Sequence, residues 1–295
     1  MPNTTIQPTL KVFARVGMCL LGTASIMLPL ATHADAQSGL PVVIRGIPSD
    51  SAAPASTELR LAYQATFPNG SLEPAVDKLD AGRMQLGDTL IPNSNPTFAP
   101  LPGEVLIGIT RPADLSPDLT PAMGLWATPV NFGPGSVSRI RATYIAPVGP
   151  IPGGGFAIGV NAKTGNKDDL STDTRIAVTV NVRPGFLVRF GVPFGATAPA
   201  RVELPQAIKD AMFSTTDPQP FTIELTVDRV EGKGMAKLMV VDQVFSVPFV
   251  LSDFVADGGP AITAVGPGLA VNPNAPGQTA SVHVREFRIY ANAGD

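Results

Sequence analysis

The side chains that could do chemistry in this sequence are few, and imidazole is among the scarcest. The chain has two histidines, His33 and His283, and a single cysteine, Cys19. His283 lies between Val282 and Val284 in an alternating stretch, which predicts a polar strand face. We interpret it as a solvated or hydrogen-bonded face histidine, and the alternative is the base of a catalytic triad. The count of Cys and His excludes a zinc site built from them.

Acidic and amide side chains gather in one polar loop. Asn166, Asp168, Asp169 and Asp173 fall within residues 161–174, and hard oxygen ligands at short spacing suit Ca²⁺. Their order departs from that of an EF-hand loop. The loop is therefore a candidate calcium site, the alternative is an ordinary solvated loop, and no other cofactor is predicted.

The first 36 residues have the features of an export signal. Lys11 and Arg15 precede an apolar, uncharged run over residues 16–30, and Ala34-Asp35-Ala36 matches a small-x-small cleavage site. The run is shorter than the ~20 residues of a membrane span, so a retained anchor is the less favoured alternative. We predict cleavage after Ala36 and a periplasmic or extracellular location, with no transmembrane segment in the mature chain.

Charge and composition limit the partners of the mature protein. Removing Lys11, Arg15 and Asp35 takes the formal charge one unit down from −3, to −4. A broad basic surface is excluded, so neither nucleic acid nor an anionic membrane is an expected partner. Cleavage also removes Cys19 and His33, so a triad would have to use His283. Stability must then come from core burial without disulfides.

Period-two alternation dominates the rest of the chain and predicts antiparallel β structure. Apolar residues alternate with polar ones over residues 137–145, 176–183 and 221–228. A change of phase near Arg285 predicts a β-bulge in the last strand. Only residues 203–214 favour a helix. Residues 37–57 are interpreted as an arm or linker, and residues 58–295 as one two-sheet antiparallel sandwich domain.

Three segments have no clear strand pattern. Residues 91–103 are dense in turn residues, and residues 111–136 form a long connection that contains Trp126, the one tryptophan. Residues 258–277 are rich in Gly and Pro, and within them only residues 262–265 are expected to pair, briefly. Long connections in compact domains are often functional. Phe186 is instead expected inside a strand, pointing into the core.

Five short stretches have a common strand rhythm: residues 137–146, 156–161 and 222–227, Gly266-Pro267-Gly268-Leu269, and residues 284–290. Together they resemble the concanavalin A-like lectin and glucanase superfamily. The resemblance covers about residues 120–292 and implies a jelly-roll sandwich. It implies fold more than activity, because such folds host binding modules, enzymes and structural domains.

Glycoside hydrolysis is one activity that the resemblance implies as an alternative. The glucanases of this fold place Glu-x-Asp-x-x-Glu on one strand, whereas no two acids of the mature chain stand at i and i+2. Glu224 and Asp228 share a strand face, but at strand rise they lie ~13.6 Å apart. A retaining mechanism needs its two carboxyl groups about 5–5.5 Å apart, and an inverting mechanism needs them about 6.5–9.5 Å apart. Carboxylates from separate strands remain the enzymatic alternative.

Carbohydrate binding is the function that we predict first. Sugar sites combine an aromatic platform with planar polar groups, and Trp126 with Arg139, Arg141 and Asn161 would supply both if the connection folds over that sheet face. The structural alternatives are that Trp126 plugs the end of the core and that the arginines are surface or cross-strand pairs. The expected role is non-catalytic binding of a glycan or another envelope component. A structural or adhesive module without a small ligand is the third alternative, and the oligomeric state is left open.

Overall fold

The computed structural model describes residues 59–68, 76–77, 84–86, 96–115, 122–127, 136–164, 175–252, 262–271 and 276–292. The predicted signal peptide, the arm and the candidate calcium ligands Asn166, Asp168, Asp169 and Asp173 lie outside these residues and stay predictions. The only helix in the described part, α1, has seven residues, far short of the ~20 needed to cross a bilayer.

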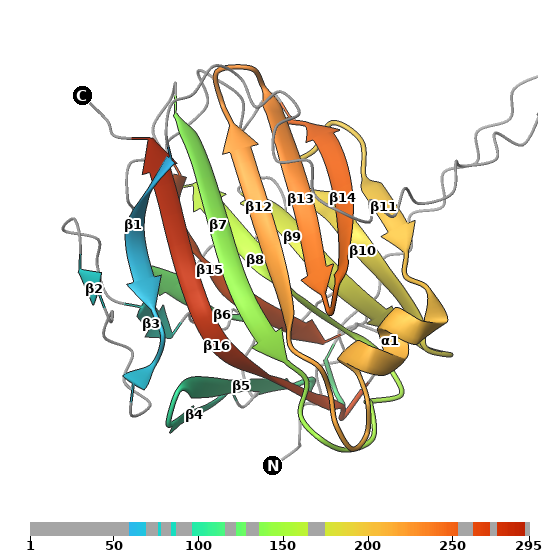
Figure 1. Cartoon of the computed structure of the whole chain (residues 1–295). Coiled ribbons are helices and arrows are strands. Elements are labelled where there is room, and N and C mark those ends of the chain that lie inside the picture. Colours follow the sequence, from blue (N-terminus) through green and yellow to red (C-terminus); the bar gives the residue numbers. More distant parts are fainter. Residues whose placement is uncertain are drawn as a thin grey trace, which may run out of the picture. The chain divides into compact units, whose positions relative to one another are not determined.

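The strands form two antiparallel sheets, which confirms the predicted two-sheet sandwich (Figure 1). The nine-stranded sheet has the order β14-β13-β12-β7-β16-β1-β2, with β5 paired to β16 and β4 to β5. The seven-stranded sheet has the order β11-β10-β9-β8-β15-β6-β3. The strands are β1 (Leu59–Ala65), β2 (Val76–Asp77), β3 (Met84–Leu86), β4 (Thr97–Leu101), β5 (Glu104–Thr110), β6 (Ala122–Ala127), β7 (Val137–Ile145), β8 (Phe156–Thr164), β9 (Arg175–Arg183), β10 (Leu187–Phe194), β11 (Ala200–Glu203), β12 (Phe221–Asp228), β13 (Lys233–Val240), β14 (Gln243–Val250), β15 (Ile262–Val271) and β16 (Thr279–Asn292).

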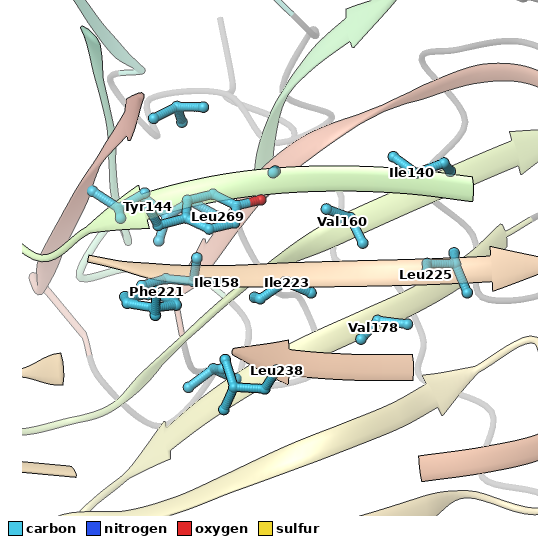
Figure 2. Packing of buried hydrophobic residues seen from close by; sticks show 14 of the residues in the cluster. Ile140, Tyr144, Ile158, Val160, Val178, Phe221, Ile223, Leu225, Leu238 and Leu269 are labelled. Atoms are coloured by element: carbon cyan, nitrogen blue, oxygen red, sulfur yellow. The ribbon is translucent and has the colours of Figure 1, made fainter. Parts of the chain in front are cut away.

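Alternating apolar residues from both sheets meet in one core. Ile140 of β7 and Ile223 of β12 point inward from the nine-stranded sheet, and Ile158 of β8 and Val178 of β9 point inward from the other (Figure 2). All four are fully buried. Burying each such side chain contributes about 1.5–3 kcal/mol to the stability of the fold. Because one side of each strand faces this core, the alternate residues of the strand point outward.

α1 (Gln206–Met212) closes one end of this core. Ile208 and Met212 of the helix are buried, and Phe213 directly after it contacts three other aromatic rings. Its ring centroid lies 5.9 Å from that of Phe156 and 6.1 Å from that of Phe221. The helix predicted within residues 203–214 is therefore confirmed, and it ties β8, β12 and the turn before β10 together.

Two irregular features mark the nine-stranded sheet. The pairing of β16 with β7 shifts register between Val284 and Glu286, which confirms the bulge predicted near Arg285. At the other end of the sheet, β14 pairs with β13 and with no other described strand, so it is an edge strand, although its last carbonyl, at Val250, accepts from Thr197 N. It carries the exposed Pro248, and proline tolerates an edge because its missing N–H faces solvent there.

Three sequence-based expectations differ from the structure. Residues 258–277 contain the ten-residue strand β15, which lies between β8 and β6 in the seven-stranded sheet. Within residues 91–103, β4 pairs with β5 along its length. Trp126 lies in β6 and not in an irregular connection. In each case pairing to neighbouring strands satisfies the backbone of a segment whose own composition disfavours a strand.

Candidate functional site

The outer surface of β9, β10 and β11 is the strongest candidate for a binding site. On β9 the core residues Val178, Val180 and Val182 alternate with Thr179, Asn181 and Arg183, which therefore point outward. On β10 and β11 the same alternation turns Arg189, Gly191, Pro193 and Arg201 outward. We call the surface made by Thr179, Asn181, Arg183, Arg189, Gly191, Pro193 and Arg201 the arginine face; these residues line one shallow depression.

Strand register places the three arginines of this face in a line. Arg189 stands opposite Asn181 of β9, two residues before Arg183. Arg201 stands opposite Gly191, two residues beyond Arg189 on β10. Each step is thus a diagonal cross-strand step of roughly 7–8 Å. The three arginines therefore lie at even spacing on one diagonal line across the three strands.

Gly191 keeps this surface shallow and closely packed. A Cβ atom at Gly191 would lie 2.0 Å from the Ala200 carbonyl oxygen and 2.7 Å from Arg201 Cα, so any side chain would displace β11. The depression above it has a volume of only about 20 Å³. Such a surface contacts one side of a ligand and does not enclose it.

Within the described residues, the three arginines of the arginine face form no ion pair. Among the described residues, no carboxylate lies within ion-pair distance of Arg183, Arg189 or Arg201. Glu203, which stands opposite Arg189, is 3.2 Å from Lys209 Nζ of α1. The acid nearest in register therefore pairs with the helix, and no described carboxylate is left to pair with the three guanidinium groups.

An apolar pocket adjoins the arginine face and shares Arg183 with it. Its volume is about 330 Å³, within the usual range for small-ligand sites. Phe186 lies at φ 59° in the β9–β10 turn, and its ring is 6.2 Å from that of Phe213. The pocket is lined by Pro150, Ile151, Pro152, Gly153, Val182, Arg183, Gly185, Phe186 and Thr215.

The loop that forms the far side of this pocket is held by one glutamine. Gly154 N donates to Gln278 Oε1 at 2.7 Å, and Gln278 Nε2 donates to the Gly155 carbonyl at 3.3 Å. The pocket wall is thereby fixed to the start of β16. Sequence reasoning missed Phe186 as a site residue because it placed this ring in a strand, whereas β10 begins at Leu187. The Pro184-Gly185 pair before it was the available turn signal.

The residues predicted to form a site together lie on opposite surfaces. Arg139 and Arg141 alternate with core residues of β7, so they point outward from the nine-stranded sheet. Asn161 of β8 points outward from the seven-stranded sheet, where its Nδ2 lies 2.5 Å from the position of a Cβ built on Gly268. Trp126 belongs to β6 of that same sheet, and its side chain lies outside the described part. Arg139 and Arg141 therefore do not share a site with Asn161.

Arginines on the nine-stranded sheet have acidic neighbours. Arg139 Nε lies 3.7 Å from Glu224 Oε1, and Arg141 stands between Glu224 and Arg288 in register. Arg288 pairs with Glu286 and donates to Tyr290 Oη at 3.4 Å. The bond to Tyr290, opposed by desolvation and supported by Glu286, raises the pKa of Arg288. This outer face is a ladder of mixed charge.

His283 also belongs to a surface charge cluster. Its Nδ1 lies 3.0 Å from Glu104 Oε1 without hydrogen-bond alignment, and Arg285 Nε lies 3.2 Å from Glu104 Oε2. Within the described residues, His, Cys, Asp and Glu nowhere gather in a group of three or more that could hold a metal ion. The geometry at His283 is that of a face histidine beside an acid.

Comparisons with known proteins give only distant similarities. No family model matches the chain, and no curated protein matches it. A lectin from Bauhinia forficata in complex with GalNAc is 13% identical, with a TM-score of 0.44, and the match covers 70% of this chain and 98% of the lectin. An endo-1,3-β-glucanase from Streptomyces sioyaensis is 12% identical, with a TM-score of 0.47 and coverage of 83% and 100%.

A third solved structure is the CBM2 module of the evolved Dit protein of Lactobacillus casei BL23 phage J-1. It is 12% identical, with a TM-score of 0.48, over 80% of this chain and 98% of the module. Lectins and a glucanase are thus among the structures to which the chain is similar, as the sequence resemblance predicted. At this distance the similarities assign no function, and the function is argued from the site itself.

Proposed function

We propose that this chain is an exported, non-catalytic carbohydrate-binding domain whose ligand lies along the arginine face and against the apolar pocket. The observation that carries the proposal is the continuity of the two at Arg183, which lines both. Export is supported by the sequence of residues 1–36.

A sugar ring has an apolar face and a rim of hydroxyl groups, and the two surfaces offer a partner for each. Phe186 and the prolines of the pocket supply apolar area, while Asn181, Thr179 and the guanidinium groups supply donors and acceptors at fixed spacing. Arginine binds in a planar, pre-organised geometry and loses less entropy per hydrogen bond than lysine does. An open surface of this kind suits an extended oligosaccharide.

A glycan array probed with the mature chain, residues 37–295, tests the proposal. We expect saturable binding by the wild-type protein, and at least a tenfold loss of affinity in Arg183→Gln, because a hydrogen bond to a charged group is worth about 1.5–3 kcal/mol. Arg139→Gln is the matched control, since it removes the same group from the opposite outer face. Wild-type protein that binds no glycan refutes the proposal. Release of reducing ends from a bound glycan would refute its non-catalytic part.

A further inference from the structure

The charge on the arginine face identifies the chemical class of the ligand. We propose that it is an acidic polysaccharide, and that Arg183, Arg189 and Arg201 bind successive carboxylate or sulfate groups along it. This inference rests on the proposed carbohydrate-binding function. It adds the sign of the charge, the number of anionic contacts and the polymeric nature of the ligand.

The first argument is the missing counter-charge. Three guanidinium groups on neighbouring strands repel one another, and like charges in close cross-strand positions destabilise a sheet. On the nine-stranded sheet, Arg139 and Arg288 have Glu224 and Glu286 as partners. On the arginine face, the one acid in register, Glu203, pairs with Lys209. A bound anion would supply the charge that the described residues do not.

The second argument is the geometry of the line. Two diagonal steps place the Cα atoms of Arg183 and Arg201 roughly 15 Å apart, with Arg189 midway. A single small anion would leave at least one guanidinium without a partner. A chain that carries an acidic group at regular intervals can engage all three, and the planar fork of arginine fits carboxylate and sulfate oxygens in pairs.

The third argument concerns other polyanions. The whole chain has a formal charge of −3, so no net positive field attracts polyanions in general, and an anionic ligand has to be recognised by the local charge and shape of this face. The positive charge is confined to one shallow face next to an apolar pocket. Phe186 and the prolines there favour a ligand with rings as well as charges. A sugar polymer has both, and its ring faces can lie on the pocket.

Matched pairs of polymers test the inference by isothermal titration calorimetry. Polygalacturonate is compared with its fully methyl-esterified form, and dextran sulfate with dextran, so that charge changes while the backbone is kept. We expect binding of at least one charged polymer, at least tenfold weaker binding of its neutral counterpart, and affinity that falls as salt rises. The first pair reports carboxylate recognition and the second sulfate recognition.

Variants connect the binding to the three residues. Arg189→Gln and Arg201→Gln are each expected to lower the affinity for the charged polymer at least tenfold and to reduce its salt dependence. Arg139→Gln, on the other outer face, is expected to leave both unchanged. Circular dichroism and thermal unfolding check that each variant folds, and these exposed or half-buried positions should tolerate glutamine.

The outcomes separate the two proposals. Equal affinity for charged and neutral polymers would overturn the acidic ligand and leave carbohydrate binding standing. Single-stranded DNA or vesicles of anionic lipid bound as tightly as the charged polymer would overturn the inference by showing that charge alone is recognised. Absence of binding to every glycan on the array and to all four polymers would overturn both proposals.

Discussion

Replacing Tyr144 by phenylalanine should destabilise the fold by about 1–3 kcal/mol, although only one oxygen atom is removed. Tyr144 of β7 is fully buried, and its hydroxyl donates to the Gly159 carbonyl of β8 at 2.6 Å. This bond joins the two sheets through the core. Without it the buried carbonyl loses a donor that no solvent can replace. For a domain of this size the loss corresponds to a fall in Tm of roughly 2–12 °C.

The loss of stability caused by Tyr144→Phe should become smaller as the pH rises above 10. Burial raises the pKa of Tyr144 well above its ordinary value, and a backbone hydrogen bond at Gly268 opposes the rise. Because the folded pKa lies above the unfolded value of about 10, the stabilisation is complete below pH 10 and declines above it. The wild-type protein therefore loses stability through this group as the pH rises above 10, and the variant does not.

Urea denaturation followed by circular dichroism at pH 8, 9, 10 and 11 measures both effects. The difference in unfolding free energy between wild type and Tyr144→Phe should narrow between pH 8 and pH 11. Tyr290→Phe is the control, because Tyr290 is only half-buried on the outer face. A difference that stays constant up to pH 11 would refute the reasoning from burial. A cost below about 0.5 kcal/mol at pH 8 would refute the role of the hydrogen bond.

Three further outcomes are expected. Phe186→Gly keeps the positive φ but removes the ring from the pocket, so the affinity for glycan measured by calorimetry should fall about tenfold. Val241→Gly is the control: Val241 also has a positive φ but is exposed in a hairpin turn, so this variant should raise Tm and leave glycan binding unchanged. If Asp168, Asp169 and Asp173 bind calcium with a Kd of ~10 µM, about 1 mM CaCl₂ is roughly 100 times the Kd and should raise the unfolding free energy by about 2.7 kcal/mol relative to EDTA-treated protein. Unchanged stability would contradict the calcium site. Mass spectrometry of the secreted protein should give an N-terminus at Gln37, and an intact N-terminus would contradict cleavage after Ala36.

The parts of the fold that alternation determines could be predicted from sequence. β7 has a complete period-two pattern in sequence and in burial, so each of its side chains is assigned to the core or the outside without knowledge of the neighbouring strands. In β12 the sequence alternates in the same way, but the polar Thr222, Glu224 and Asp228 are buried too. The change of phase at Arg285 likewise located the bulge in β16. These features depend on one strand and one core, which a local pattern describes.

Features that depend on a neighbour could not be found in this way. β15 contains Pro267 and two glycines, and only pairing with β8 and β6 makes it a strand. Arg139 and Arg189 have the same alternating context in sequence. One stands beside a carboxylate and the other opposite an acid that pairs with Lys209, because the register sets their partners. The hypothesis of a site at Arg139, Arg141 and Asn161 was made without knowledge of this strand register. Phe186 was missed because its role depends on a turn with positive φ.

Pro248 has a consequence for how copies of the protein can associate. The outward side of β14 is an edge of the nine-stranded sheet among the described strands, and at its C-terminal end the Val250 carbonyl already accepts from Thr197 N at 3.0 Å. A second copy could continue the sheet only by hydrogen bonding along this edge. Pro248, the third residue from the end of β14, offers no donor there, so a continuous intermolecular sheet would be interrupted near the C-terminal end of the strand. Self-association by strand addition is therefore disfavoured at β14.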